Sequence, residues 1–201
     1  MIRKENRIHS RPQLQDWLNY EKSRYPKIST LKYILQANEP AILWKHQVLL
    51  RTAEYHINTK HKFRAAISKF RLNRFQNKYA LHIPPNVCGR GLKLLHVGPI
   101  LMNGLCSVGE NCSFHINTAL VGGGTSNGAP TLGNDIVVGI GAIVVGDTHI
   151  PDGVAIGANA VVNKDVAEAN IAVAGVPAVK ISNNGKLEWN KNPKQRASSA
   201  E

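Results

Sequence analysis

The 201-residue chain lacks any apolar run of the roughly 18 residues that a helix needs to cross a membrane. Its basic start, MIRKENRIHSRPQLQ, is not followed by the apolar stretch of a secretory signal. Only three cysteines occur, Cys88, Cys106 and Cys112, without the C-x-x-C spacing of a zinc knuckle. Such thiols fit reduced cysteines packed as small apolar groups, so we expect a cytoplasmic protein without a disulfide framework.

Acidic residues are scarce in the first 80 residues, which hold 17 Lys and Arg against 5 Asp and Glu. Residues 81–201 hold 8 of each kind, so the whole formal net charge of +12 belongs to the first segment. A basic segment of this kind is suited to contact with an anionic surface, including peripheral contact with the inner face of a membrane. No recognition motif accompanies the charge, so we expect no nucleic acid as a partner.

The first 80 residues have the pattern of a helical segment. Pro12 and Pro40 stand where prolines open helices, and Ser29 precedes a run whose apolar residues are spaced for a further helix. The double proline of HIPPN, after Tyr79, ends this pattern. We therefore predict three segments: an α-helical segment over residues 1–80, a repeat domain over residues 81–181, and a polar, disordered tail over residues 182–201 with an anchor at Trp189.

A fourth predicted helix, TKHKFRAAISKFRLNRFQNK, holds seven Lys and Arg and no acid. Its expected N-cap is Thr59, and helical spacing aligns Phe63, Ile67 and Phe70 along one stripe. The interpretation is an amphipathic, basic helix. It either packs within an assembly or touches an anionic surface.

The second part of the chain counts in sixes. One position in each hexad is aliphatic or aromatic: Val108, Phe114, Leu120, Leu132, Val138, Val144, Ile150, Ile156 and Val162. Four positions further on, each hexad from Leu132 onward carries a small or β-branched residue: Ile136, Ala142, Thr148, Val154, Ala160 and Val166. This period matches neither a helix nor a half-buried strand, and a sandwich of short strands would need period-2 alternation. Hexads are typical of a parallel β-helix, in which three hexads make one turn and the large residue points inward.

A polar stretch, GGGTSNGAPT, interrupts the repeat between Leu120 and Leu132. These two residues are twelve apart, so the hexads resume in register. A glycine-rich excursion on a regular prism is where a binding loop is expected, although an ordinary surface bulge has the same composition.

Four of the eight histidines lie in the helical segment, where we expect surface or capping positions. In the repeat domain, His96 and His115 are 19 residues apart, one coil plus one residue, so adjacent coils should bring them together. Two neighbouring imidazoles beside a glycine-rich loop suit a general base and its partner. They also suit two ligands of a metal, but no third ligand has fitting spacing, so we expect no metal. A non-catalytic solenoid scaffold is a further alternative, which would need no such pair.

Several motifs in order resemble the catalytic region of hexapeptide-repeat acetyltransferases: IPPNVCGRGLKLLHVGPILMN, SVGENCSFHINTALVGGG, NGAPTLGNDIVVGIGAIVVGD and VAIGANAVVNKDV…AVAGVPAVKI. The likeness is to the serine acetyltransferase-like branch, and most of all to its members that O-acetylate sugars of capsules and other surface polysaccharides. It covers about residues 79 to 181.

This resemblance implies a left-handed β-helix, a homotrimer, and active sites between subunits. It assigns to His96 the removal of the proton from an acceptor hydroxyl, which attacks the thioester of the co-substrate acetyl-CoA. It also implies that one set of residues binds the cofactor: Gly122, Gly123, Gly139, Ile140, Gly157, Ala158, Pro177 and Lys180.

The chain departs from serine acetyltransferases at three positions. Their acids just before the catalytic histidine and about fifteen residues upstream are Leu95 and Leu81 here, and a second loop histidine is Ala129. An amino-acid acceptor needs charged partners, so these losses favour a carbohydrate acceptor. His115, with Asn103 or Asn117, is expected to orient His96 or the acceptor. The sequence thus predicts an acetyl-CoA-dependent O-acetyltransferase of surface polysaccharide, with a serine O-acetyltransferase of cysteine biosynthesis as the alternative.

Overall fold

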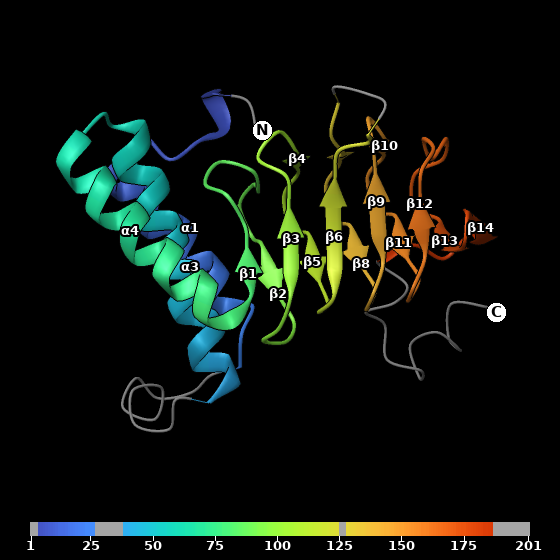
Figure 1. Cartoon of the computed structure of the whole chain (residues 1–201), viewed down its shortest axis with the longest axis horizontal. Helices are drawn as coiled ribbons and strands as arrows, with labels where there is room; N and C mark the ends of the chain where they lie inside the picture. Colours follow the sequence, from blue (N-terminus) through green and yellow to red (C-terminus); the bar gives the residue numbers. More distant parts are fainter. Residues whose placement is uncertain (1–3, 27–37, 125–127, 187–201) are drawn as a thin grey trace.

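The computed structural model describes residues 4–26, 38–124 and 128–186. At one end of the molecule lie a short 3-10 turn, η1 (Lys4–Asn6), and the helices α1 (Arg11–Ser23), α3 (Glu39–Asn58) and α4 (Lys62–Tyr79) (Figure 1). Pro12 and Pro40 stand in the first turns of α1 and α3, as predicted. The side chains of Ser10 and Asn38 cap these helices by accepting from backbone amides. The helix expected after Ser29 falls outside the described residues.

Short strands make up the rest of the described chain: β1 (Leu81–His82), β2 (Lys93–Leu94), β3 (Ile100–Met102), β4 (Ser107–Val108), β5 (Ser113–Phe114), β6 (Thr118–Val121), β7 (Thr131–Leu132), β8 (Val137–Val138), β9 (Ile143–Val145), β10 (His149–Ile150), β11 (Ala155–Ile156), β12 (Val161–Val162), β13 (Ala172–Gly175) and β14 (Ala178–Ser182). From β4 to β12, each strand pairs in parallel with the strand three places further along. The chain therefore winds as a three-sided coil.

The three sides are three sheets. The first, sheet A, has the order β1-β3-β6-β9-β12, the second, sheet B, has β10-β7-β4, and the third, sheet C, has β14-β13-β11-β8-β5-β2 (Figure 1). All pairings are parallel except the β13–β14 hairpin. The predicted inward hexad residues fill the interior between the sheets, each at most 2% exposed: Val108, Phe114, Leu120, Leu132, Val138, Val144, Ile150, Ile156 and Val162. The free thiols Cys88, Cys106 and Cys112 are buried among them.

Coil length departs from the regular repeat at two places. Leu132 pairs with Ile150, 18 positions on, whereas Val108 pairs with Leu132, 24 positions on, because that coil contains the glycine-rich loop. Leu94 pairs with Phe114, 20 positions on. The two extra residues lie between β2 and β3, in the turn that holds His96.

Buried charges attach the helices to the first coil. The guanidinium of Arg51 on α3 bonds Glu21 on α1 at 2.7 Å and Glu54 at 2.8 Å, and it donates to the carbonyls of Cys88 and Gly89. All three charged side chains are buried, so each carboxylate depends on the one guanidinium for its charge balance. This network fixes where α3 meets the coil.

Two local predictions about the helices are wrong. Thr59 does not cap α4; its hydroxyl donates to Tyr55 O at the end of α3, and His61 is the N-cap residue of α4. His46 is fully buried rather than at the surface or in a cap, and its Nε2 lies 3.0 Å from the Gln76 amide of α4.

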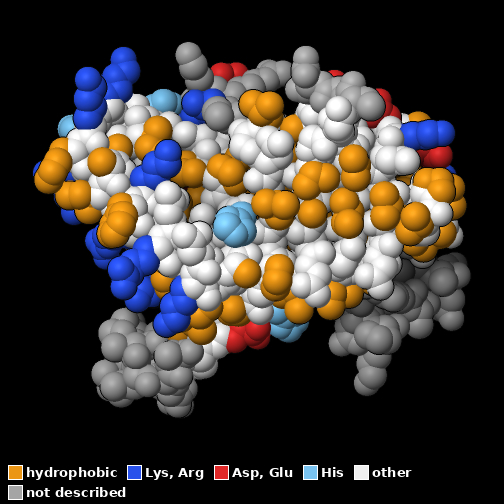
Figure 2. Space-filling view, in the orientation of Figure 1, with side chains coloured by type: hydrophobic (Ala, Val, Ile, Leu, Met, Phe, Trp, Pro, Cys, Tyr) orange, Lys and Arg blue, Asp and Glu red, His pale blue; other side chains and the backbone are white. Residues whose placement is uncertain are grey.

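The basic helix α4 packs on α3 through a face that includes Ser68, Leu72 and Gln76. The stripe of Phe63, Ile67 and Phe70 faces away, with Phe63 79% exposed and Phe70 66% exposed. Apolar and basic side chains consequently lie next to one another on the helical end (Figure 2). No helix in the described parts of the chain has the length and apolar character to span a membrane.

The start of the predicted tail packs against the coil instead of leaving it. Lys186 is 5% exposed and its backbone amide donates to Gly153 O. The predicted anchor at Trp189 and the remaining tail lie outside the described residues.

Candidate active site

One corner of the coil carries most of the predicted site. Four turns stack there, each joining a strand of sheet C to a strand of sheet A: residues 95–99, 115–117, 139–142 and 157–160. Backbone hydrogen bonds hold them in a column, from His115 N to Val138 O at 3.0 Å and from Gly139 N to Ile156 O at 2.8 Å. Asn117, Gly141 and Asn159 occupy equivalent left-handed positions, which these residue types adopt at little cost.

The column brings His96 and His115 together, as predicted. Leu94 pairs with Phe114, so His96 stands one residue beyond the register of His115. The ring centroids are 6.0 Å apart and inclined by 33°. Burial, and then the nearby charge of His96, lower the pKa of His115 below its ordinary value. His115 therefore stays neutral near pH 7, as a hydrogen-bonding partner rather than a second cation.

A carboxylate that the sequence analysis missed stands beside His96. Glu39, in the first turn of α3, has Oε2 3.3 Å from His96 Nδ1, and its Oε1 accepts from Val97 N at 2.8 Å. The side chains of His96 and Glu39 are about half exposed, at 54% and 45%. The one signal available in the sequence was an acid placed directly before the helix-opening Pro40.

Four of the predicted cofactor residues lie in the same column as His115. Gly139 and Gly157 leave no room for a side chain: a Cβ at Gly139 would meet Ile156 O at 2.7 Å, and one at Gly157 would meet the Ala174 side chain. Beside them, Ile140 and Ala158 are exposed on the outside of the corner. These turns leave a low, apolar track along the coil, starting at His115.

Other predicted residues lie on a different corner. Asn103 follows β3 and Gly122 follows β6, both at the end of sheet A, and the Asn103 amide lies beside Gly122. Asn103 Oδ1 is engaged in its own turn by Leu105 N at 2.9 Å. Within one chain, the structure does not bring Asn103, Gly122 and Gly123 to the histidine corner. Asn117 does belong there, and its amide donates to Pro99 O, next to the turn of His96.

Pro177 and Lys180 belong to the β13–β14 hairpin at the far end of the coil. Both are exposed, and the Lys180 amine forms an ion pair with Glu168. Among the described residues there is no group of three or more His, Cys, Asp or Glu that could hold a metal ion.

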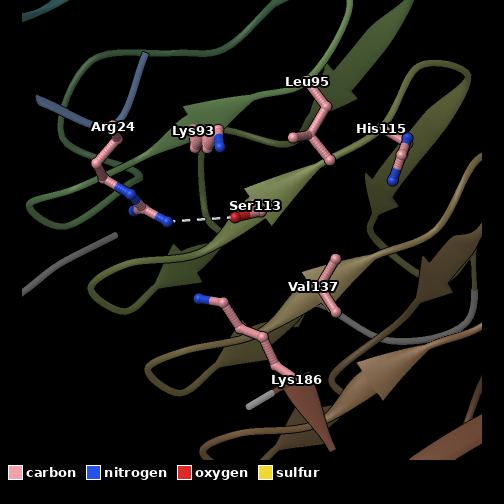
Figure 3. A pocket seen from close by; sticks show the side chains of 7 residues that line it. All are labelled: Arg24, Lys93, Leu95, Ser113, His115, Val137 and Lys186. Atoms are coloured by element: carbon pink, nitrogen blue, oxygen red, sulfur yellow. Dashed lines mark hydrogen bonds between the residues drawn. The ribbon is translucent and has the colours of Figure 1, made fainter. Parts of the chain in front are cut away.

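A pocket of about 440 Å³ opens on the outer face of sheet C, beside the histidine corner. It is lined by Arg24, Lys93, Leu95, Ser113, His115, Val137 and Lys186. Figure 3 shows the three cationic side chains at one end and His115 at the other, with Leu95 and Val137 between them.

Comparison with known proteins gives a consistent set of relatives, although no protein-family model matches the chain. The serine acetyltransferase of Helicobacter pylori is 33% identical over 156 residues, which span 72% of this chain and 90% of that protein. The serine acetyltransferase of Staphylococcus aureus is 26% identical over 159 residues, spanning 78% of this chain and 71% of the relative.

Solved structures give the same result for the fold. The serine acetyltransferase of Brucella abortus strain S19 superposes with a TM-score of 0.67 at 22% identity, covering 88% of this chain and 72% of that one. The same enzyme in complex with coenzyme A gives a TM-score of 0.63 at 25% identity, covering 86% of this chain and 67% of that one.

The prediction of a carbohydrate acceptor in surface or capsular polysaccharide assembly is therefore wrong, because the relatives are serine acetyltransferases. That prediction depended on the missing acids at Leu81 and Leu95. The structure shows why the argument failed: a carboxylate does reach His96, but it comes from Glu39 on a helix. The prediction of an enzyme that uses acetyl-CoA is confirmed.

Proposed function

The chain belongs to the serine acetyltransferase family of hexapeptide-repeat acetyltransferases and is an acetyl-CoA-dependent acyltransferase, and we propose that its acceptor is the hydroxyl of L-serine. The observation that carries this proposal is the pairing of His96 with Glu39 at the corner of the coil. A catalytic base for a weakly acidic hydroxyl needs both an imidazole and a group that fixes its orientation and tautomer.

His96 acts as the general base. With Nδ1–H donating to the Glu39 carboxylate, the free lone pair is on Nε2, which accepts the proton of the serine hydroxyl. As that proton leaves, the oxygen attacks the carbonyl carbon of the acetyl thioester. The negative charge of Glu39 stabilises the imidazolium that forms.

The second half of the reaction returns the proton. The tetrahedral intermediate collapses, its bond to sulfur breaks, and the leaving thiolate takes the proton from His96. The products are O-acetylserine and coenzyme A, and the enzyme is restored. His115, neutral and 6.0 Å away between ring centroids, assists by keeping a second positive charge away from the base.

The donor is proposed to lie along the column of turns. The track beside Gly139, Ile140, Gly157 and Ala158 begins at His115, so a long, thin chain laid along it points its thioester at the histidines. Lys180 in the end hairpin supplies a cation for the phosphates at the opposite end. Gly122 and Gly123 join the same site from a neighbouring subunit.

We further infer a left-handed β-helix over residues 81–181 and a homotrimer with active sites between subunits. The split of the predicted residues over two corners supports this, because only a second copy can bring the Asn103 and Gly122 corner to the histidine corner. An apolar row crosses sheet A in strict register: Leu101, Ala119, Ile143 and Val161. Figure 2 shows apolar side chains gathered over this face, which a second copy would cover. Light scattering after gel filtration gives the subunit number.

The helical end is proposed to rest on an anionic membrane surface. The stripe of Phe63, Ile67 and Phe70 points outward on α4, a helix with basic residues and no acid, and this pairing of exposed aromatic rings with cations suits a lipid interface.

The first test is release of coenzyme A from acetyl-CoA in the presence of L-serine. We expect turnover with wild type and a loss of roughly 10²- to 10⁴-fold in kcat for His96→Ala, with an unchanged elution volume. Normal turnover by His96→Ala would remove the assignment of the base. Absence of turnover with L-serine in the wild type would remove the proposed acceptor.

A further inference from the structure

We propose that the cationic pocket on sheet C binds an oxyanion carried by the acceptor, so that the enzyme selects hydroxyl compounds bearing a carboxylate or a phosphate. This rests on the proposed function only for the identity of the reacting corner. The pocket itself is a feature of the described residues (Figure 3).

Three cations from distant parts of the chain converge on the pocket. Arg24 follows α1, Lys93 belongs to β2, and Lys186 follows β14. No Asp or Glu occurs among its lining residues. One acidic side chain reaches this group from outside: Asp135 Oδ1, 3.4 Å from the Lys186 amine. The described surroundings therefore leave a net positive charge facing the cavity.

Arg24 is held in place with part of its guanidinium unused. Its Nη2 donates to Asn111 O at 3.3 Å and to Ser113 Oγ at 3.4 Å. Its Nη1 is buried and has no hydrogen-bond partner in the part of the chain that the structure describes. A buried donor of a charged group that lacks a partner is costly, and a bound oxyanion would satisfy it.

The two lysines are also prepared for an anion. Lys186 is 5% exposed and its amine donates to Asn111 O, so this cation is fixed at the pocket rather than extended into solvent. Burial, and then the charge of Arg24, lower the pKa of Lys93. An anion between them would offset this repulsion and the loss of hydration.

The pocket adjoins the reacting corner directly. His115 forms one of its walls, and Leu95 is the residue before His96. An acceptor whose oxyanion is held by Arg24 and Lys93 would extend its hydroxyl past Leu95 and His115 toward the base. The residue Leu95, where relatives carry an acid according to the sequence comparison above, keeps this passage free of negative charge.

The test is equilibrium binding by titration calorimetry with three probes that each carry a hydroxyl. L-serine offers a carboxylate, glycerol 3-phosphate offers a phosphate, and L-serinamide offers neither. The variants are Arg24→Gln and Lys93→Gln, and the matched control is Lys164→Gln, which removes an exposed lysine outside the pocket. Circular dichroism confirms that each variant is folded, and the comparison of probes on wild type needs no variant.

We expect wild type to bind at least one oxyanion probe roughly tenfold or more tightly than L-serinamide. Both pocket variants should lose that advantage, while Lys164→Gln keeps it. Dependence on the pocket for L-serine identifies a carboxylate, and dependence for glycerol 3-phosphate alone identifies a phosphate. Equal affinity for all three probes in wild type, or a change confined to the KM for acetyl-CoA, would overturn the proposal. Because binding is measured without turnover, failure of serine acetylation is a separate result.

Discussion

Glu39 contacts the turn of His96 at two points, across 57 residues of sequence. One carboxylate oxygen lies 3.3 Å from His96 Nδ1, and the other accepts the backbone amide of Val97 at 2.8 Å. The second bond fixes the carboxylate relative to the turn, and the first then fixes the ring. The helical segment thereby takes part in the chemistry of the repeat domain.

Replacing Glu39 by Gln should lower kcat roughly tenfold or more and leave the KM for both substrates nearly unchanged. The amide removes the negative charge that stabilises the imidazolium and permits the wrong ring tautomer. Glu39→Asp should recover part of the rate, because it keeps the charge. Glu110→Gln, an exposed acid elsewhere on the coil, is the control. A rate for Glu39→Gln equal to that of the control would show that the contact has no role in catalysis.

The interior of the coil could be predicted from sequence because the repeat is local. An inward residue every sixth position requires no knowledge of distant partners, and Val138, Val144 and Ile156 are indeed fully buried. The meeting of His96 and His115 followed from counting one coil. That count missed the enlarged coil of 20 residues between Leu94 and Phe114, and the pair still met because the extra residues lie in the turn of His96.

The rest of the site could not be predicted, since it depends on how the helices dock. Glu39 reaches His96 only because the Arg51 network sets the position of α3 on the first coil. Helical spacing likewise identified the stripe of Phe63 and Phe70 but not its direction. Which face of α4 is covered is decided by α3, whose packing no pattern within α4 records.

Replacing Arg51 by Met should lower the free energy of unfolding by about 3–5 kcal/mol. The change leaves Glu21 and Glu54 buried without their cation and removes the donor to the Cys88 and Gly89 carbonyls. Urea denaturation at fixed protein concentration measures the loss. Asp16→Asn, which breaks an exposed ion pair with Arg90, should cost less than about 1 kcal/mol. Similar losses for the two variants would contradict the structural role of the network.

Stability should fall below about pH 6.5 because His46 is buried in its neutral form. Burial, followed by the charge of Arg51, lowers the pKa of His46 from 6.5 to about 3. Between these values the unfolded chain binds the extra proton and the native protein does not, so stability is full above pH 6.5 and decreases with acidification. The contribution lost between pH 7.5 and pH 5.5 is about 1.4 kcal/mol.

His46→Gln isolates this contribution, since glutamine does not titrate. The free energy of unfolding of the variant, followed by urea denaturation from pH 7.5 to 5.5, should decline less steeply than that of wild type. The difference between the two curves corresponds to one proton. Parallel curves would mean that His46 does not remain neutral in the native protein.

The exposed stripe on α4 predicts binding to anionic lipid. Wild type should sediment with vesicles of phosphatidylcholine containing roughly one-third phosphatidylglycerol, and not with phosphatidylcholine alone, because both the cations and the aromatic rings contribute. The double variant Phe63→Ser, Phe70→Ser should lose most of the binding, whereas Val179→Ser, an exposed apolar residue on β14, should keep it. If the double variant instead changes the subunit number in light scattering, or if wild type stays in the supernatant with anionic vesicles, the stripe is not a lipid-binding surface. The basic charge would then have no membrane partner, since α4 carries the densest cluster of cations beside exposed rings in the described chain.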